Sequence, residues 1–220
     1  MPATRIKARP DELRLFLKTA GFRLVAGTDE AGRGCLFGPV FAAAVILPPG
    51  VRINGVRDSK ELTPARREEL APRIAKVAVA WAIACATAEE IDRINIYQAS
   101  RLAVKRAVSR LSPAPDFLLV DALSIDLPLP QLSLVHGDAR CRSIAAASIL
   151  AKVHRDACVR EWDALFPDYG LARSKGYGTP DHLAALERLG PTAQHRFTFE
   201  PVRQLLPSRQ MYLLEAASCG

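Results

Sequence analysis

The chain has 220 residues, of which 49% are hydrophobic and 24% charged, a composition typical of a soluble globular protein. Its formal net charge of +7 is compatible with a polyanionic partner such as a nucleic acid. The longest apolar run, from Val40 to Leu47, is too short to cross a bilayer, and no apolar segment of a secretory signal follows the N-terminal charges. These features exclude a membrane-spanning chain and lead us to expect a cytoplasmic location.

The first half of the chain alternates apolar runs with helical patterns. Residues 24–28 and 38–47 predict two strands separated by a glycine-rich turn. Residues 64–77 predict a helix despite Pro72, and residues 77–87 predict a buried strand.

A second helix is predicted over residues 95–111, where apolar residues recur at helical spacing. Its other face is basic and is most simply explained as solvated; it carries Arg101, Lys105, Arg106 and Arg110.

The second half predicts two short buried strands, at 117–120 and 131–135, before an Ala-rich helix over residues 140–166. Thr179 is expected to cap a further helix that begins at Pro180 and runs through Leu189. Strands followed by helices interleaved with strands predict a mixed α/β or α+β domain around one sheet.

The cysteines are five, widely spaced, and show neither a Cys-x-x-Cys pair nor the Cys/His spacing of a zinc site. We therefore expect reduced thiols rather than disulfides. The five are Cys35, Cys85, Cys141, Cys158 and Cys219.

Acidic residues lie at three places where an apolar run ends: Asp29-Glu30, Asp121 and Asp138. Carboxylates gathered in a partly buried site repel one another, so they require protonation or a divalent cation between them. Oxygen ligands favour Mg²⁺ or Mn²⁺ over zinc, and such clusters support two-metal hydrolysis of phosphodiesters.

Each acid taken alone has a structural alternative as a turn or helix-cap residue, and Asp138 could simply be the N-cap of the long helix. Asp116 and Asp126 also flank turns, and we interpret both as structural.

The sequence Gly32-Arg33-Gly34 follows the first acidic pair directly. Glycines let the backbone approach a ligand and expose its N–H groups, while arginine can bind a phosphate. A lone Gly-x-Gly is common in turns, and here no G-x-G-x-x-G fingerprint opens a helix.

Several longer motifs occur in an order that resembles bacterial ribonuclease HII, over roughly residues 22–206. They are G-T-D-E-A-G-R-G at 27–34, D-S-K at 58–60, L-V-D at 119–121, G-D at 137–138, S-I-A-A-A-S-I-L-A-K-V-x-R-D at 143–156, G-Y-G-T at 176–179 and H-R-F-T-F at 195–199.

The resemblance implies an α/β chain with an RNase H-like fold: a central mixed sheet flanked by helices, with a small C-terminal helical portion. Residues 1–206 would form the catalytic domain including that portion, and residues 207–220 a C-terminal tail. It further implies a Mg²⁺- or Mn²⁺-dependent endonuclease that cuts the RNA strand of RNA/DNA hybrids and nicks duplex DNA 5′ of an embedded ribonucleotide, leaving 3′-hydroxyl and 5′-phosphate ends.

The family's catalytic, metal-binding carboxylates fall on Asp29, Glu30, Asp121 and Asp138. Its ribonucleotide-sensing turn falls on Gly32, Arg33 and Gly34, where exposed backbone can read a 2′-hydroxyl, and its junction tyrosine on Tyr177. Further expected substrate contacts are Lys60, Ser143 and Ser148, with helix capping as the alternative for Ser143. Lys152 and Arg155 would brace the acids or pair with Asp156.

Three positions depart from the family pattern: Ala122 and Cys141 replace a common glycine and serine, and His136 replaces a common lysine. Two other functions compete with the endonuclease. One is a non-catalytic nucleic-acid-binding module, and the other is an enzyme acting on small phosphorylated molecules, for which no phosphate-loop signature is present. We expect a monomer without a membrane partner, and the sequence leaves the preferred metal and substrate open.

Overall fold

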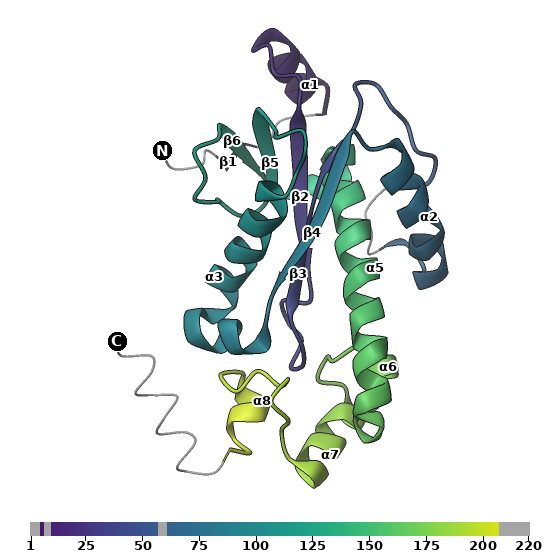
Figure 1. Cartoon of the computed structure of the whole chain (residues 1–220), viewed down its shortest axis with the longest axis vertical. Coiled ribbons are helices and arrows are strands. Elements are labelled where there is room, and N and C mark those ends of the chain that lie inside the picture. The colour runs from purple at the N-terminus through teal and green to yellow at the C-terminus, as the bar shows by residue number, and fades with distance from the viewer. Residues whose placement is uncertain (1–4, 7–9, 57–60, 207–220) are drawn as a thin grey trace. The chain divides into compact units, whose positions relative to one another are not determined.

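The computed structural model describes residues 5–6, 10–56 and 61–206 (Figure 1). Lys60 and the tail at 207–220 lie outside the described residues. The chain divides into two compact units. We call Met1–Ala31, Phe41–Cys85 and Arg101–Val153 the sheet unit, and Gly32–Val40, Ala86–Ser100 and His154–Gly220 the helical unit. The extent of the catalytic domain, expected as residues 1–206, stays a prediction.

The sheet unit contains a six-stranded mixed sheet with the order β1-β6-β5-β2-β3-β4. β2 pairs antiparallel with β3, whereas β2, β5, β6 and β1 pair in parallel. The strands are β1 (Arg5–Ile6), β2 (Val25–Ala31), β3 (Val40–Ile46), β4 (Ala80–Ala86), β5 (Phe117–Asp121) and β6 (Gln131–Leu134). The predicted mixed sheet is confirmed.

The first acidic pair lies inside a strand, not after one. β2 continues past residue 28 to Ala31, so Asp29 and Glu30 pair with Ala43 and Ala42 of β3. The small partners explain why two acidic residues fit within a ladder. The expectation that this strand ends at residue 28 was therefore wrong by three positions.

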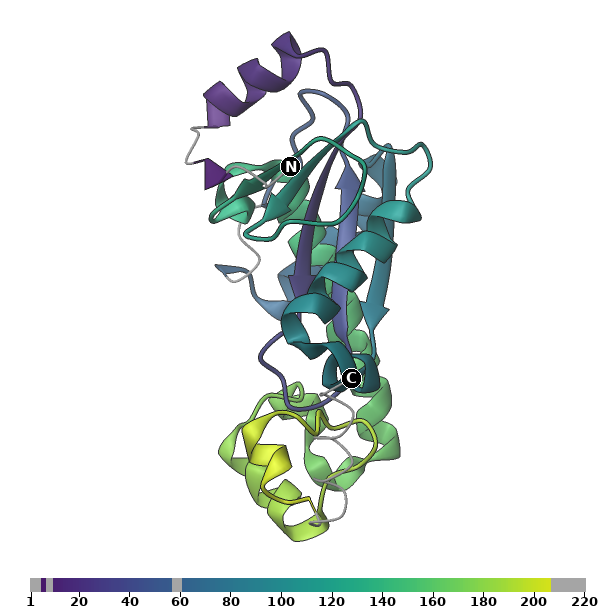
Figure 2. The same cartoon turned by 90° about the vertical axis from the view of Figure 1, so that its left-hand side faces the viewer.

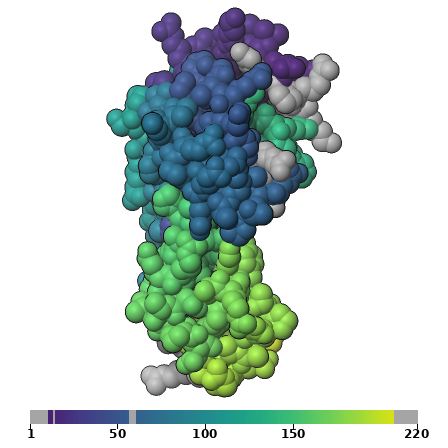
Figure 3. All heavy atoms as spheres, turned by 90° about the vertical axis from the view of Figure 1, so that its right-hand side faces the viewer, coloured from purple at the N-terminus to yellow at the C-terminus, as the bar shows by residue number. Residues whose placement is uncertain are grey.

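Helices α2 (Pro64–Val77) and α5 (Arg142–Leu165) cover one face of the sheet in the sheet unit (Figure 1). Leu70 and Ile74 of α2 and Ile149 of α5 share a buried cluster with Val45 of β3. The outward side of α2, in blue, forms part of the surface in Figure 3. The boundaries predicted for α2 are confirmed exactly as residues 64–77, because Thr63 caps the helix and Pro64 begins it.

Two further helices contribute to this unit. The sequence pattern missed α1 (Pro10–Thr19), whose Leu13 packs in a cluster with Phe117, Leu132 and Ile144. The four-residue α4 (Gly137–Arg140) was also missed, and it directly precedes α5.

The opposite face of the sheet carries the C-terminal part of α3 (Ala88–Ser109) (Figure 2). The expected solvated basic face is only partly correct, because three of its arginines bind backbone carbonyls. Arg101 donates to Ser124 O at 2.7 Å, Arg106 to Cys85 O at 2.9 Å, and Arg110 to Ile83 O at 3.0 Å. These side chains tie the helix to the sheet and its loops.

Asn95 breaks α3 at the place where the sequence predicted the helix to start. It adopts φ 63° and ψ 163°, and its Oδ1 accepts a hydrogen bond from Gln98 N at 3.1 Å. The part after Asn95 therefore has its own side-chain cap. The helical turns before Asn95 were not predicted.

The helical unit contains a 3₁₀ turn, η2 (Pro167–Tyr169), and three short helices. The helices are α6 (Leu171–Ser174), α7 (Pro180–Leu189) and α8 (Glu200–Arg203). Thr179 caps α7 by accepting from His182 N at 3.4 Å, which confirms the predicted start at Pro180. This unit provides the expected C-terminal helical portion.

The remaining expectations concern single residues. Asp116 accepts from Arg23 N at 2.7 Å and Leu24 N at 3.0 Å, which confirms its structural role. The four cysteines within the described part of the chain are free thiols. Among the helices that the structure describes, none has the length and apolarity needed to cross a membrane.

Two of the three departures from the family pattern have left-handed backbone. Ala122 adopts φ 50° immediately after β5, and His136 adopts φ 55° before α4. In this region a Cβ crowds the carbonyl oxygen, at a cost of about 1–2 kcal/mol relative to glycine. Part of that cost is offset because alanine has less conformational freedom than glycine in the unfolded chain.

We expect Ala122→Gly to stabilise the protein by about 0.5–1 kcal/mol, which corresponds to a Tm higher by about 2 °C. Thermal unfolding followed by circular dichroism measures the change. Ala65→Gly is the matched control, since Ala65 is exposed within α2 and glycine there should lower the Tm. An Ala122→Gly protein that melts at or below the wild-type temperature would contradict the strain at this position.

Candidate active site

The sheet register brings carboxylates of the sheet unit to one end of neighbouring parallel strands. Thr28 of β2 pairs with Val120 of β5, so the next residues, Asp29 and Asp121, follow at the same end of the two strands. Asp121 in turn pairs with Leu134, after which the chain enters α4 with Asp138 in it. Three separate stretches of sequence thus deliver acids to one edge.

Burial and neighbouring charges both affect the pKa of Asp29. Burial raises the pKa of Asp29 well above its usual value, and the charges of Glu30 and Asp121 raise this pKa further. A hydrogen bond from the Ser148 hydroxyl opposes the shift. A positive charge close by would favour the ionised form of this carboxylate.

Asp121 and Asp138 are linked through the backbone of α4. Gly137 N donates to Asp121 Oδ1 at 2.9 Å, and Asp138 Oδ1 accepts from Ala139 N at 3.0 Å. Asp138 is buried inside α4, whereas α5 begins only at Arg142. The alternative that Asp138 is the N-cap of the long helix was therefore wrong.

The carboxylates at this edge of the sheet could supply only part of the coordination shell of a hard divalent cation. Asp29, Glu30 and Asp121 offer carboxylate oxygens whose mutual repulsion a cation would offset. Across residues 5–6, 10–56 and 61–206, no three His, Cys, Asp or Glu side chains form a group that could hold a metal ion. Mg²⁺ commonly takes one or two protein carboxylates and completes its shell with water and substrate phosphates, so these residues are compatible with it.

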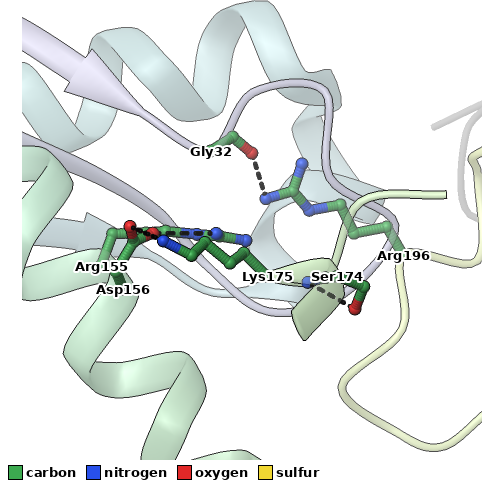
Figure 4. A network of polar contacts seen from close by, with 7 residues as sticks. Gly32, Arg155, Asp156, Ser174, Lys175 and Arg196 are labelled. Carbon is green, nitrogen blue, oxygen red and sulfur yellow. Dashed lines mark hydrogen bonds and ion pairs between the residues drawn. The ribbon is translucent and has the colours of Figure 1, made fainter. Parts of the chain in front are cut away.

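The Gly32-Arg33-Gly34 turn is held within the helical unit by a buried arginine, Arg196 (Figure 4). Arg196 donates from Nη2 to Gly32 O and from Nη1 to Arg33 O, both at 2.7 Å. Residue 32 must be glycine for two reasons. It adopts φ +94°, and a Cβ there would lie 3.1 Å from Arg155 Nε. The sequence placed Arg196 in a motif but gave it no role.

Tyr177 follows a tight turn and keeps 40% of its surface exposed. The guanidinium of Arg155 lies over its ring, 5.5 Å from the centroid. Arg155 pairs with Asp156 at 3.4 Å, and Asp156 pairs with Lys175 at 3.0 Å (Figure 4). The expected pairing of Arg155 with Asp156 is confirmed, and it supports the underside of the tyrosine.

A buried histidine pair holds the backbone of Tyr177 from another direction. Thr192 N donates to His195 Nδ1 at 3.0 Å, the two Nε2 atoms of His195 and His182 lie 3.2 Å apart, and His182 Nδ1 lies 2.8 Å from Tyr177 O. These contacts fit one set of tautomers: His195 carries its proton on Nε2 and His182 on Nδ1. Both rings are then neutral and fully hydrogen bonded.

The sequence model for ribonuclease HII matches residues 26–202. Similar relatives include the ribonuclease HII of Solibacter usitatus (strain Ellin6076), 63% identical over 209 residues that cover 93% of this chain and 92% of the relative. The ribonuclease HII of Geobacillus kaustophilus (strain HTA426) is 51% identical over 93% of this chain and 80% of its own length.

Solved structures agree on the fold. Ribonuclease H2 from Pyrococcus horikoshii OT3 has a TM-score of 0.70 at 24% identity and covers 87% of this chain and 98% of its own. The RNase HII of the PCNA:RNase HII complex from Archaeoglobus fulgidus has a TM-score of 0.70 at 27% identity, covering 84% and 98%.

The mixed sheet with acids at one edge defines an RNase H-like nuclease, and the resemblance read from the sequence is confirmed. The chain belongs to the ribonuclease HII family. It is an endonuclease that degrades the RNA of RNA/DNA hybrids and nicks at embedded ribonucleotides, and enzymes of this class depend on divalent metal ions.

The histidine pair predicts a loss of stability on acidification. Burial, and then the neighbouring His182, lowers the pKa of His195 to about 3, and burial lowers the pKa of His182. Unfolded histidine binds a proton below about pH 6.5 whereas the native ring does not, so stability is full above that pH and falls below it. We expect His195 alone to lower the free energy of unfolding by about 1 kcal/mol at pH 5.5.

Urea unfolding at pH 7.5 and pH 5.5 tests this expectation. Acidification has the opposite effect through Asp29, because its raised pKa means that protonation stabilises the native state. The pH-dependent change in the free energy of unfolding is therefore compared between variants that all retain Asp29. The pH-dependent loss should shrink in His195→Gln and persist in the exposed control His154→Gln. An equal loss in both variants would show that the buried pair is not its source.

Proposed function

We propose that Asp29, Glu30, Asp121 and Asp138 are the catalytic carboxylates and hold the divalent ion together with water and substrate phosphates, which complete its shell. The observation that carries this proposal is the strand register: Asp29 and Asp121 follow a pair of bonded residues at the same end of β2 and β5, and Gly137 N, next to Asp138, donates to Asp121 Oδ1 at 2.9 Å. A bound divalent ion would supply activation of the attacking water and stabilise the leaving oxygen. The carboxylates themselves would hold that ion in place, because without it their negative charge would repel the scissile phosphate.

The ion is Mg²⁺ or Mn²⁺ in this proposal, because the donors are hard oxygens. Ser148 is buried and hydrogen bonded to Asp29, which favours a role in orienting that carboxylate over direct substrate contact. Ser143 lies in the first turn of α5 and is proposed to contact a phosphate, as is Lys60. A monomeric state and a cytoplasmic location remain predictions.

Ribonucleotide recognition is assigned in this proposal to Gly32, Arg33, Gly34 and Tyr177. Gly32 follows Glu30 by two positions in the chain. The backbone of the turn would read the 2′-hydroxyl, Arg33 would contact a phosphate, and the Tyr177 ring would stack on the sugar or base beside it.

Asp121→Asn is expected to reduce cleavage by at least about 100-fold, since it removes one charge that stabilises the reacting centre. The substrate is a labelled DNA duplex with one ribonucleotide, assayed with Mg²⁺, Mn²⁺ or excess EDTA beside all-DNA and RNA/DNA duplexes. Asp126→Asn is the matched control on the loop after β5, because Asp126 is exposed and only approaches Lys105 at 3.7 Å.

Retained cutting by a folded Asp121→Asn protein would remove this carboxylate from the reaction. If the wild type binds the duplexes but cuts none of them under any metal condition, the non-catalytic binding module would replace the endonuclease.

Tyr177→Ala should weaken cleavage of the single-ribonucleotide duplex by about tenfold, because one stacked ring contributes about 1–3 kcal/mol. Tyr177→Phe keeps the ring and should retain most of the activity. Tyr97→Ala removes another exposed tyrosine of the helical unit and serves as the control. The effect is measured as the kcat/KM of each variant divided by that of the wild type, both for the single-ribonucleotide duplex. Equal kcat/KM values for Tyr177→Ala and wild type would exclude stacking.

A further inference from the structure

Arg196 is an unusual buried cation, because its hydrogen bonds go to backbone carbonyls. Besides Gly32 O and Arg33 O, it donates from Nε to Gly38 O at 3.0 Å. Its guanidinium also lies 5.2 Å from the centroid of the Phe199 ring. Burial lowers the pKa of Arg196 to about 10, so the side chain remains charged at neutral pH. One planar group thus binds both ends of the segment from Gly32 to Gly38.

The backbone around Arg196 is anchored independently of its side chain. Arg196 N donates to Leu36 O at 2.8 Å, and Gly38 N donates to Gln194 O at 2.8 Å. On the other side, Asp92 accepts from Phe197 N and Thr198 N, both at 2.9 Å. These contacts hold the backbone of Arg196 in place. The Arg196 guanidinium in turn holds the Gly32-Arg33-Gly34 turn in place.

The hydrogen bonds from Arg196 to the carbonyls of the turn also determine where the N–H groups of the turn point. In a planar trans peptide the C=O and N–H groups point in opposite directions. The carbonyls of Gly32 and Arg33 point to Arg196, so the N–H groups of Arg33 and Gly34, in the same peptide units, point away from it. Two neighbouring donors are thereby turned in one direction, which is the arrangement needed to bind an oxygen of a sugar or phosphate.

We propose that Arg196 is the positioning residue for ribonucleotide recognition: by binding the carbonyls of Gly32, Arg33 and Gly38, it sets the turn so that its N–H groups meet the 2′-hydroxyl. The inference rests on the proposed function of that turn. Arg196 itself does not touch substrate, since it is fully buried. Its effect on the preference for a ribonucleotide is larger than its effect on the affinity for an ordinary DNA backbone, which many other contacts share.

The test measures binding in full-length Asp121→Asn protein, which keeps the duplex intact. The Kd for an all-DNA duplex is divided by the Kd for the same duplex with one ribonucleotide, both with Mg²⁺ at fixed salt. Arg196→Lys retains the charge but lacks the planar fork that reaches three carbonyls. Arg196→Met fills the space without a buried charge and gives a second variant if lysine prevents folding. Arg173→Lys is the control, on an exposed arginine of the helical unit.

We expect the ratio to fall by at least about tenfold in Arg196→Lys and in Arg196→Met, as loss of a charged hydrogen-bond network implies. The Kd for all-DNA duplex should stay within about twofold of the parent protein, and Arg173→Lys should match the parent throughout. A loss of folded protein would weaken the binding of both duplexes equally and leave the ratio of their Kd values unchanged. A change in this ratio therefore distinguishes a positioning role of Arg196 from an effect on stability.

A folded Arg196→Lys or Arg196→Met protein that keeps the parent ratio would overturn the inference. A parent protein with equal affinity for the two duplexes would overturn the proposed role of the turn, and the role of Arg196 with it. The two failures are distinct, because the first appears only in the variants and the second is already present in the parent.

Discussion

The sheet unit depends on one close approach, that of the start of α5 to β2 at Gly27. A Cβ at this position would lie 2.4 Å from Ile144 N and 2.6 Å from Ser143 Cβ, a distance that side chains do not tolerate. Only glycine lets the helix lie directly on the strand, two residues before the first carboxylate. The same helix then brings the Ser148 hydroxyl to Asp29. Because backbone rather than flexible side chains makes this contact, the geometry around Asp29 is set by the fold itself.

The two units treat charge in opposite ways. In the sheet unit Asp29, Glu30 and Asp121 repel one another, which is a cost to stability that a bound cation would relieve. In the helical unit two sets of buried polar groups are satisfied by hydrogen bonds: the His182–His195 pair is neutral, and Arg196 donates to carbonyls. A strained cluster suits chemistry, whereas a satisfied network suits a rigid recognition surface.

The sequence predicted regular elements well, because periodicity and caps report on local structure. Thr63, Pro64, Thr179 and Pro180 fixed two helix starts through capping, and apolar runs located the strands. The positive φ at Asn95 was missed, although the Asn95 side chain caps the helix that follows by accepting from Gln98 N. The first strand was expected to end at residue 28, whereas β2 extends through Asp29 and Glu30, opposite small residues of β3.

The site was predictable to a different degree for acids and for arginines. Acids at strand ends have a local signal, and the family motifs identified the substrate-reading turn. Arg196 had no such signal, because its partners are carbonyls 158 to 164 positions away in the chain and carbonyls carry no residue identity. Lys60 lies outside the described residues, so its role depends on the resemblance alone.

The net charge overstates how many arginine donors can bind phosphates, because several arginines bind backbone carbonyls instead. The formal net charge of +7 suggests a large surplus of cations for phosphates. Yet Arg101, Arg106, Arg110 and Arg196 all donate to backbone carbonyls, and Arg142 donates to Val51 O at 3.0 Å. An arginine that holds backbone together has fewer donors left for a phosphate, and a buried one has no access to it. These arginines therefore offer a duplex fewer hydrogen-bond donors than composition implies, which places more of the binding on directed contacts such as those of the glycine-rich turn.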